Sequence, residues 1–268
     1  MERIENLLSR EGISFSKTKV IRDGVEKEVL AVGEGTCKLA IYENTFNGSE
    51  TDDEIMKFVH SYLEGKPELA TVEEWVSWDY AKDNVRISLR PRSTIDDDRY
   101  AKRIINDNLE AIYRIFIPEG TIPVPHNLLE KWKISENELY LAALMNVNNM
   151  TTSMSLDSML GFEDEESPDM EIPMIIFSNT EMNFGGASIL NTKKLEEIAQ
   201  KYEDDLYIIP SSVHECIVTP AAKNDYYTIK SMIEEVNETN LRPEDVLANY
   251  PFYYERGSDK VNFEPKSA

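Results

Sequence analysis

Hydrophobic residues in the first 65 positions follow helical spacing in two places, with strand-type runs between them. Apolar residues three and four positions apart predict a helix over residues 2–10, and the same spacing predicts a second helix that begins after residues 49–53. Asp23-Gly24 predicts a hairpin turn, because Gly tolerates a positive φ. Short apolar runs predict three strands, at residues 20–21, 29–32 and 37–42.

The next pattern predicts a helix whose start is marked by Thr71. Glu74 follows three residues later, as in a capping box, where two side chains satisfy each other's backbone N–H groups. Trp75 and Trp78 are three residues apart, so we expect both rings on one face of this helix and in the core.

Proline and glycine interrupt the pattern at residues 118–125. We therefore expect two modules, residues 1–117 and residues 118–268. In the first module, the apolar spacing also predicts a strand over residues 85–89, a helix over residues 100–105, and either a helix or a strand over residues 109–117.

The second module alternates helices with short strands, and residues 148–169 form an irregular acidic connection with one helical turn. Ser135 and Glu138 make a second capping-box pattern. Helices are expected at residues 126–132, 135–147, 192–202, 229–236 and 243–247. Strands are expected at residues 172–177, 187–190, 206–209 and 213–219, with a final hairpin of residues 252–255 and 261–263. The pattern predicts the α+β class, with antiparallel sheets and helices packed on one face.

Acidic residues outnumber basic ones by 50 to 28, which gives the chain of 268 residues a formal net charge of −22. This charge disfavours binding to nucleic acid and to anionic lipid, because both depend on Lys and Arg. It is also uneven, since residues 134–192 contain no Lys or Arg, whereas seven basic residues crowd into residues 82–103.

Three interpretations of the stretch without basic residues stay open. It is a solvated loop, a docking surface for a basic partner such as a nucleic-acid enzyme, or a segment that folds against the basic residues of the same chain. For the docking surface we single out an acidic segment, made of Glu163, Asp164, Glu165, Glu166, Asp169 and Glu171.

The composition also bears on compartment. No run approaches the roughly 20 apolar residues that a membrane span needs, and residues 1–10 lack the pattern of a signal peptide. Cys37 and Cys216 do not make a disulfide framework. We therefore expect a cytoplasmic protein with reduced thiols and no membrane association.

Motifs for phosphate, dinucleotides or metals are missing from the sequence, so we expect no cofactor and no metal. Residues 183–186 lack three-glycine spacing and are expected to form a tight turn. The candidate catalytic residues are Ser212, His214 and Glu215. A Ser–His pair also needs an orienting acid and an oxyanion hole, which the sequence does not identify, so we favour a structural turn in which the Ser hydroxyls satisfy amides.

The sequence resembles a known family over most of its length. The resemblance is carried in order by WKISENELY (132–140), IFSN (176–179), FGGASIL (184–190), DLYIIPSSVHE (205–215), EEVNET (234–239), PEDVL (243–247) and YYER (253–256). The chain is identified as a member of the bacterial domain-of-unknown-function family 5688, common in gut anaerobes and often found near mobile elements. This resemblance implies no activity and no catalytic residues.

We therefore expect a non-enzymatic factor that binds a protein with a basic surface, in a regulatory or inhibitory role linked to mobile elements. The alternative is a hydrolase or small-ligand-binding protein centred on Ser212, His214 and Glu215. A third interpretation is a structural subunit, for which a large exposed apolar patch would be the sign. The sequence indicates no particular oligomeric state.

Overall fold

The computed structural model describes residues 1–22, 25–34, 38–43, 45–46, 48–65, 69–92, 99–118, 120–159 and 172–266. The chain forms two compact units, Met1–Ser77 (unit 1) and Trp78–Ala268 (unit 2). The boundary expected between residues 117 and 118 lies within unit 2, between two paired strands. The hairpin turn expected at Asp23-Gly24 and the acidic segment both lie outside the described residues.

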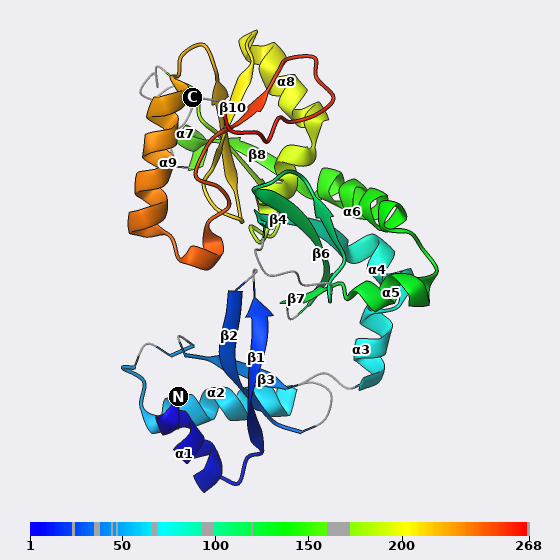
Figure 1. Cartoon of the computed structure of the whole chain (residues 1–268), viewed down its shortest axis with the longest axis vertical. Coiled ribbons are helices and arrows are strands. Elements are labelled where there is room, and N and C mark those ends of the chain that lie inside the picture. The colour runs from blue at the N-terminus through cyan, green and yellow to red at the C-terminus, as the bar shows by residue number, and fades with distance from the viewer. Residues whose placement is uncertain are drawn as a thin grey trace. The chain divides into compact units, whose positions relative to one another are not determined.

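Unit 1 is a small antiparallel sheet with helices packed against it. Its strands pair in the order β1-β2-β3 (Figure 1). Leu30 and Ile41 are paired, so they point to the same face, where they form a core with Leu8 and Val59 from two helices. The elements are α1 (Glu2–Arg10), β1 (Phe15–Arg22), β2 (Val25–Val32), β3 (Leu39–Tyr42), α2 (Asp52–Gly65) and α3 (Leu69–Trp75). The first two helices and the three strands confirm the expected pattern.

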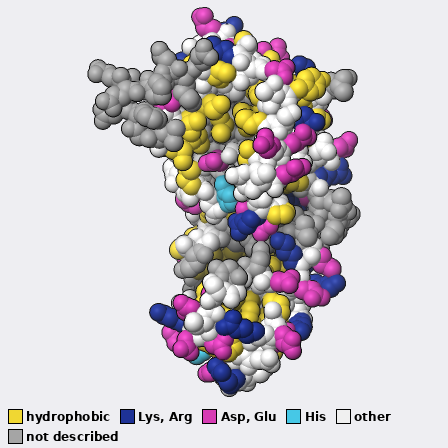
Figure 2. Space-filling view, turned by 90° about the vertical axis from the view of Figure 1, so that its left-hand side faces the viewer, with side chains coloured by type: hydrophobic (Ala, Val, Ile, Leu, Met, Phe, Trp, Pro, Cys, Tyr) yellow, Lys and Arg dark blue, Asp and Glu magenta, His cyan; other side chains and the backbone are white. Residues whose placement is uncertain are grey.

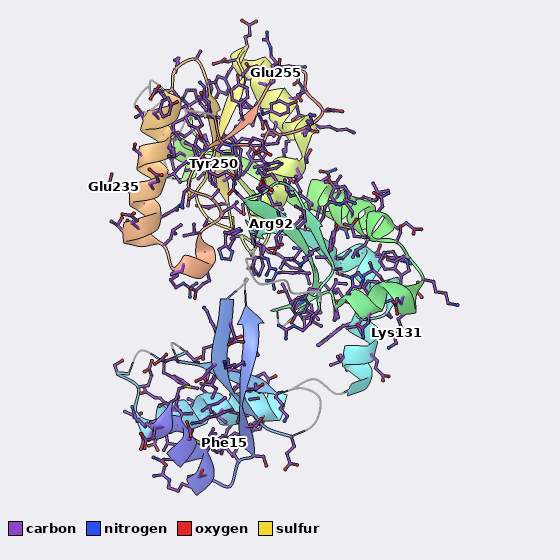
Figure 3. The ribbon with its side chains drawn as sticks, in the orientation of Figure 1. Phe15, Arg92, Lys131, Glu235, Tyr250 and Glu255 are labelled. Carbon is purple, nitrogen blue, oxygen red and sulfur yellow. The ribbon has the colours of Figure 1, made fainter. Side chains whose placement is uncertain are left out.

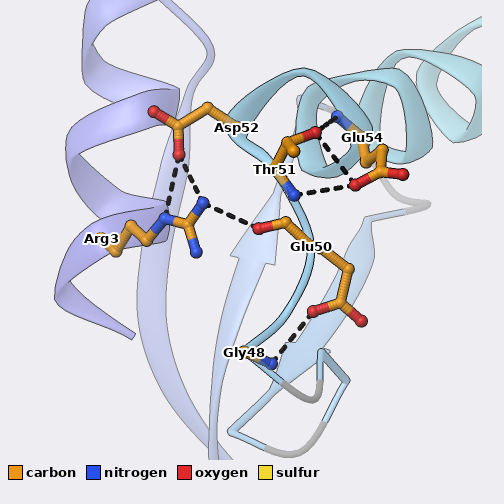
Figure 4. Close-up of polar contacts among 6 residues, drawn as sticks. All are labelled: Arg3, Gly48, Glu50, Thr51, Asp52 and Glu54. Carbon is orange, nitrogen blue, oxygen red and sulfur yellow. Dashed lines mark hydrogen bonds and ion pairs between the residues drawn. The ribbon is translucent and has the colours of Figure 1, made fainter.

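Polar contacts fix the start of α2 (Figure 4). The backbone N–H and the hydroxyl of Thr51 donate to Glu54 Oε2, and the Glu54 N–H donates back to Thr51 Oγ1, which makes a capping box. The hydrogen bonds from Thr51 lower the pKa of Glu54. Arg3 of α1 donates to Asp52 Oδ1 and to the carbonyl of Glu50, so α1 is tied to the first turn of α2.

We predict that Thr51→Ala lowers the free energy of unfolding of unit 1 by about 1 kcal/mol, because Ala offers no acceptor to the Glu54 N–H. Ser61→Ala is the matched control, since Ser61 is exposed inside the same helix and Ala has the higher helix propensity. Urea unfolding followed by circular dichroism measures both variants. Equal losses would contradict the capping role.

The last helix of unit 1 differs from the expectation. Thr71 lies inside α3, which begins at Leu69, so the expected cap at Thr71 was wrong. The Ser77 N–H bonds the carbonyl of Glu74, which closes the helix, and Trp78 begins the next one. Trp75 and Trp78 therefore lie on different helices, and the expectation of one shared face was also wrong. Trp75 is buried, as expected for a core residue.

The first sheet of unit 2 is built around β6 (Leu109–Ile117). β6 pairs with β4 on one side and with β5 and β7 on the other. The other strands are β4 (Val85–Pro91), β5 (Lys102–Ile104) and β7 (Gly120–Pro123), and the helices are α4 (Trp78–Asn84), α5 (His126–Trp132) and α6 (Glu136–Met150). Ser135 and Glu138 form the expected capping box. The helix expected over residues 100–105 was wrong, because β5 gains its backbone hydrogen bonds from β6 instead.

The second sheet of unit 2 has the strand order β12-β10-β11-β9-β8. Its strands are β8 (Thr151–Ser155), β9 (Ile175–Asn179), β10 (Leu206–Pro210), β11 (Cys216–Pro220) and β12 (Phe252–Tyr254). The accompanying helices are α7 (Leu156–Met159), η1 (Gly185–Leu190), α8 (Thr192–Tyr202), α9 (Tyr226–Asn240) and η2 (Pro243–Asp245). Figure 1 shows α8 and α9 on opposite sides of this sheet.

Three details of this sheet correct the sequence analysis. Residues 187–190 belong to the 3₁₀ helix η1 and not to a strand. The strand expected to begin at residue 213 begins at Cys216, and the polar strand β8 was not expected. The α+β class with antiparallel sheets is confirmed.

A buried ion pair crosses the first sheet. Arg90 and Glu110 are directly opposed on β4 and β6. The guanidinium donates to Glu110 Oε1 from Nε at 2.8 Å and from Nη2 at 2.7 Å, and the two side chains are 8% and 2% exposed. Burial makes each charge dependent on the other, because neither is solvated by water.

We predict that Glu110→Gln lowers the free energy of unfolding of unit 2 by about 3–5 kcal/mol, because the Arg90 charge stays buried without its carboxylate. Asp107→Asn is the control, since the Arg92–Asp107 pair at the same sheet is exposed and should contribute about 0–1 kcal/mol. Denaturant unfolding compares the two. Similar small losses would contradict a stabilising role for the buried pair.

Candidate functional site

The loop after β9, residues 180–184, is held in a strained conformation. Asn179 Oδ1 accepts from the N–H groups of Glu181 and Asn183, and Asn179 Nδ2 donates to the carbonyl of Asn183. Within this loop, Met182 has a φ of 52° and Phe184 a φ of 51°. Both angles lie in the left-handed region that favours Gly, and such residues cost about 1–3 kcal/mol each. The Asn179 side chain therefore maintains a loop that the backbone alone disfavours.

His214 supports the same loop from the other side. Its Nδ1 accepts a hydrogen bond from the Phe184 N–H at 3.1 Å, and the two rings pack with centroids 5.4 Å apart. Its Nε2 lies 3.5 Å from Asp245 Oδ1, and Asp245 also accepts from Arg242 Nε at 2.8 Å. The imidazole thus connects the loop after β9 to η2.

Gly185 and Gly186 let the loop approach the turn before β11. A Cβ on Gly185 would lie 2.2 Å from Ser178 Oγ and 2.6 Å from the carbonyl oxygen of His214. A Cβ on Gly186 would lie 2.9 Å from the carbonyl oxygen of Val213. The glycines are therefore required by close backbone contact, and the positive φ angles of this turn fall on other residues.

The three candidate catalytic residues lie in the turn before β11, called here the His214 turn, which the Ser212 N–H closes by bonding the carbonyl of Glu215. Ser212 is buried, and its Oγ accepts from the backbone N–H of His214 at 3.0 Å. Ser211 Oγ donates to Glu215 Oε1 at 3.2 Å. Because His214 Nδ1 already accepts from Phe184, Nε2 carries the proton of the neutral ring and faces Asp245. In this arrangement the imidazole has no lone pair to receive a proton from Ser212, and the hydroxyls bond turn groups.

Two arginines that the sequence analysis did not select hold the loop against the first sheet. Arg86 and Arg114 oppose each other on β4 and β6 and are 8% and 9% exposed. Arg86 donates to Glu181 Oε1 at 2.7 Å and lies 3.8 Å from the centre of the Phe116 ring. Arg114 lies 4.3 Å from the centre of the Phe184 ring. The crowding of basic residues over residues 82–103 could have drawn attention to Arg86 in the sequence. Arg114 is a single charged residue in an apolar run, and no sequence pattern marked it.

Some acids of the stretch without basic residues pair within the chain. Glu181 bonds Arg86, and Glu136 bonds Arg103 at 3.0 and 2.7 Å. These contacts agree with the interpretation that this stretch folds against the basic segment. The six acids of the acidic segment lie outside the described residues, so the docking interpretation stays a prediction.

Three further residues carry side chains capable of chemistry, namely Cys216, His60 and His126. Cys216 is buried, its thiol donates to the carbonyl of Gly186 at 3.7 Å, and burial raises the pKa of the thiol. His60 lies on α2 and His126 begins α5. Within the described ranges, no three metal-binding side chains gather, and no helix has the length and apolar character of a membrane span.

Apolar side chains gather on the upper part of the face seen in Figure 2, which belongs to unit 2. On α9, Ile229 and Ile233 are buried, but Met232 and Val236 are each 41% exposed. Of these four apolar residues, whose spacing predicted the helix, two therefore lie in the core and two on the surface. Other exposed apolar side chains of unit 2 include Met154 and Met159.

We predict that His214→Ala lowers the free energy of unfolding of unit 2 by about 1–3 kcal/mol, because the Phe184 N–H loses its acceptor. His214→Asn is the informative comparison, since its side-chain oxygen can take the place of Nδ1. Denaturant unfolding should show that Asn recovers about half of the loss. If Ala and Asn destabilise equally, the hydrogen bond to Phe184 does not support the loop.

Comparison with known proteins identifies one match. Residues 37–256 match the model described as the family of unknown function DUF5688. The match includes the loop after β9, the His214 turn and the C-terminal strand of the second sheet. No curated protein and no solved structure matches the chain.

Proposed function

The chain belongs to the DUF5688 family, whose function is unknown, and we propose that it is a non-enzymatic protein that binds a partner with a basic surface. The observation that carries the proposal is the net charge of −22, together with the absence of Lys and Arg from residues 134–192 of the sequence. Complementary charge speeds the encounter of two proteins and makes it sensitive to salt. The proposal includes a cytoplasmic setting, a regulatory or inhibitory role and a link to mobile elements.

The contacts of the His214 turn support a non-enzymatic role. The Ser212 hydroxyl and the accepting nitrogen of His214 are both committed to backbone N–H groups. The alternative is a hydrolase or small-ligand-binding protein centred on Ser212, His214 and Glu215. As a hydrolase it would require His214 Nδ1 to release the Phe184 N–H before that nitrogen could accept a proton. The exposed Met232 and Val236 of α9 add apolar surface of the kind found at protein interfaces.

The test is to reverse four charges of the acidic segment, by changing Glu163, Asp164, Glu165 and Glu166 to Lys. Tagged protein captures partners from a nuclease-treated bacterial lysate at low and at high salt, and mass spectrometry identifies them. We predict that the unchanged protein retains one basic protein at low salt, and that the variant retains at least tenfold less of it, because attraction becomes repulsion.

A matched variant separates this segment from general charge. Glu64, Glu73, Glu74 and Glu130 are exposed outside this segment and outside α9, and changing these four to Lys alters the net charge by the same amount. We expect this control to keep the partner. Equal retention by both variants, or equal loss, would refute the acidic segment as the docking surface.

A further inference from the structure

A cavity of about 510 Å³, called here the tyrosine pocket, opens on unit 2 between α9, the second sheet and residues 262–266. Its walls include the side chains of Tyr207, Tyr226 and Tyr253. Figure 3 labels Tyr250 and Glu255, which flank β12, the strand that carries Tyr253. The volume falls within the range of about 300–1,000 Å³ that ligand sites occupy.

The three rings are fixed by the fold. The centroid of Tyr207 lies 6.2 Å from that of Tyr226 and 5.5 Å from that of Tyr253. Tyr207 and Tyr226 pack in the core formed with Ile229 and Ile233 of α9. The Tyr253 hydroxyl donates to Asp205 Oδ2 at 2.6 Å. A ligand therefore meets rings that are already in place, which reduces the entropic cost of binding.

One carboxylate lines the pocket, and two more lie next to its tyrosines in the structure or in the sequence. Glu264 is exposed and lines the pocket. Asp205 accepts from Tyr253, and this hydrogen bond lowers the pKa of the carboxyl, so Asp205 is ionised at neutral pH. Asp225 caps α9 beside Tyr226. Since the faces of aromatic rings also carry partial negative charge, the surroundings favour a cation.

The chain places one of its own cations at this pocket. Lys266 Nζ lies 5.7 Å from the centre of the Tyr226 ring, and the Lys266 backbone N–H donates to the Tyr226 hydroxyl at 2.9 Å. Lys266 is exposed and lines the pocket, so its ammonium can leave without disturbing a buried group. This contact displays the chemistry that an external ligand would use.

We propose that the tyrosine pocket binds a lysine side chain of a basic partner protein, which replaces Lys266 at the Tyr226 ring. The identity of the partner rests on the function proposed above, but the preference of the pocket for a cation does not. An acidic side chain would be repelled by Glu264, Asp205 and Asp225, and an apolar one would gain nothing from them.

The first experiment titrates the full chain, labelled at its tyrosine rings, with three blocked tripeptides in NMR. The probes are acetyl-Gly-Lys-Gly-amide, its trimethyl-lysine analogue and its norleucine analogue. We expect the two cationic peptides to shift the same few tyrosine resonances and the norleucine peptide to shift none, because the rings attract positive charge. Equal shifts from norleucine, or no shifts from the cationic peptides, would overturn the proposal.

Variants locate the binding. Lys266→Gln should bind the lysine peptide about two- to five-fold more tightly, because the competing ammonium is removed. Lys260→Gln is the matched control, since Lys260 lines a neighbouring cavity of about 540 Å³ and not the tyrosine pocket. Tyr253→Leu should weaken binding by a similar factor, and Tyr253→Phe, which keeps the ring, should not. Identical affinities for the two Lys variants would contradict the inference.

The two proposals fail separately. If charge reversal in the acidic segment releases the partner while the lysine peptide does not bind, the protein-binding proposal stands and the tyrosine pocket inference is wrong. If the peptide binds and Tyr253→Leu releases the partner while charge reversal does not, the pocket stands and the acidic segment is not the docking surface.

Discussion

The contacts at the centre of unit 2 depend on how closely η1 approaches the turn before β11. Gly185 and Gly186 bring η1 against the turn that carries Val213 and His214, at a separation that leaves no room for a Cβ. This approach lets His214 reach the Phe184 N–H, and the Phe184 ring in turn meets a guanidinium of the first sheet. This loop therefore helps to join the two sheets of unit 2, and its shape depends on the lack of two side chains.

Charge is used in two ways in this protein. Inside unit 2, buried arginines form ion pairs of two kinds. Arg90 pairs with Glu110 on the neighbouring strand, and Arg86 pairs with Glu181 of the loop after β9 and so anchors that loop. At the surface the excess of acids is large, and the net charge of −22 repels other polyanions. The same residue types therefore contribute to folding where they are buried and, in the function proposed above, to partner selection where they are exposed.

Sequence patterns predicted the secondary structure correctly where one stripe of an element is buried, as in α1. They failed where contacts with distant parts of the chain determine whether a segment is helix or strand. Residues 109–117 are buried on both faces of β6, so no period distinguishes strand from helix. Residues 102–104 are strand because β6 lies beside them. In the candidate site, Ser212 and His214 could be selected because they are only two positions apart in the sequence. Asp245, which faces His214, and Arg86 and Arg114, which contact the loop after β9, come from distant elements, and no local pattern joins these residues.

The buried thiol of Cys216 makes the local opening of unit 2 measurable as a rate. It is enclosed by the second sheet and by Gly186, with 0% of the residue exposed, so a labelling reagent meets it when this part of unit 2 opens. With Cys37 changed to Ser, Cys216 is the remaining thiol, so the rate of alkylation measures how often that part of unit 2 opens. Because the sulfur bonds Gly186 and lies directly after the turn that the two glycines approach, the alkylation rate reports how often η1 separates from this turn and the start of β11.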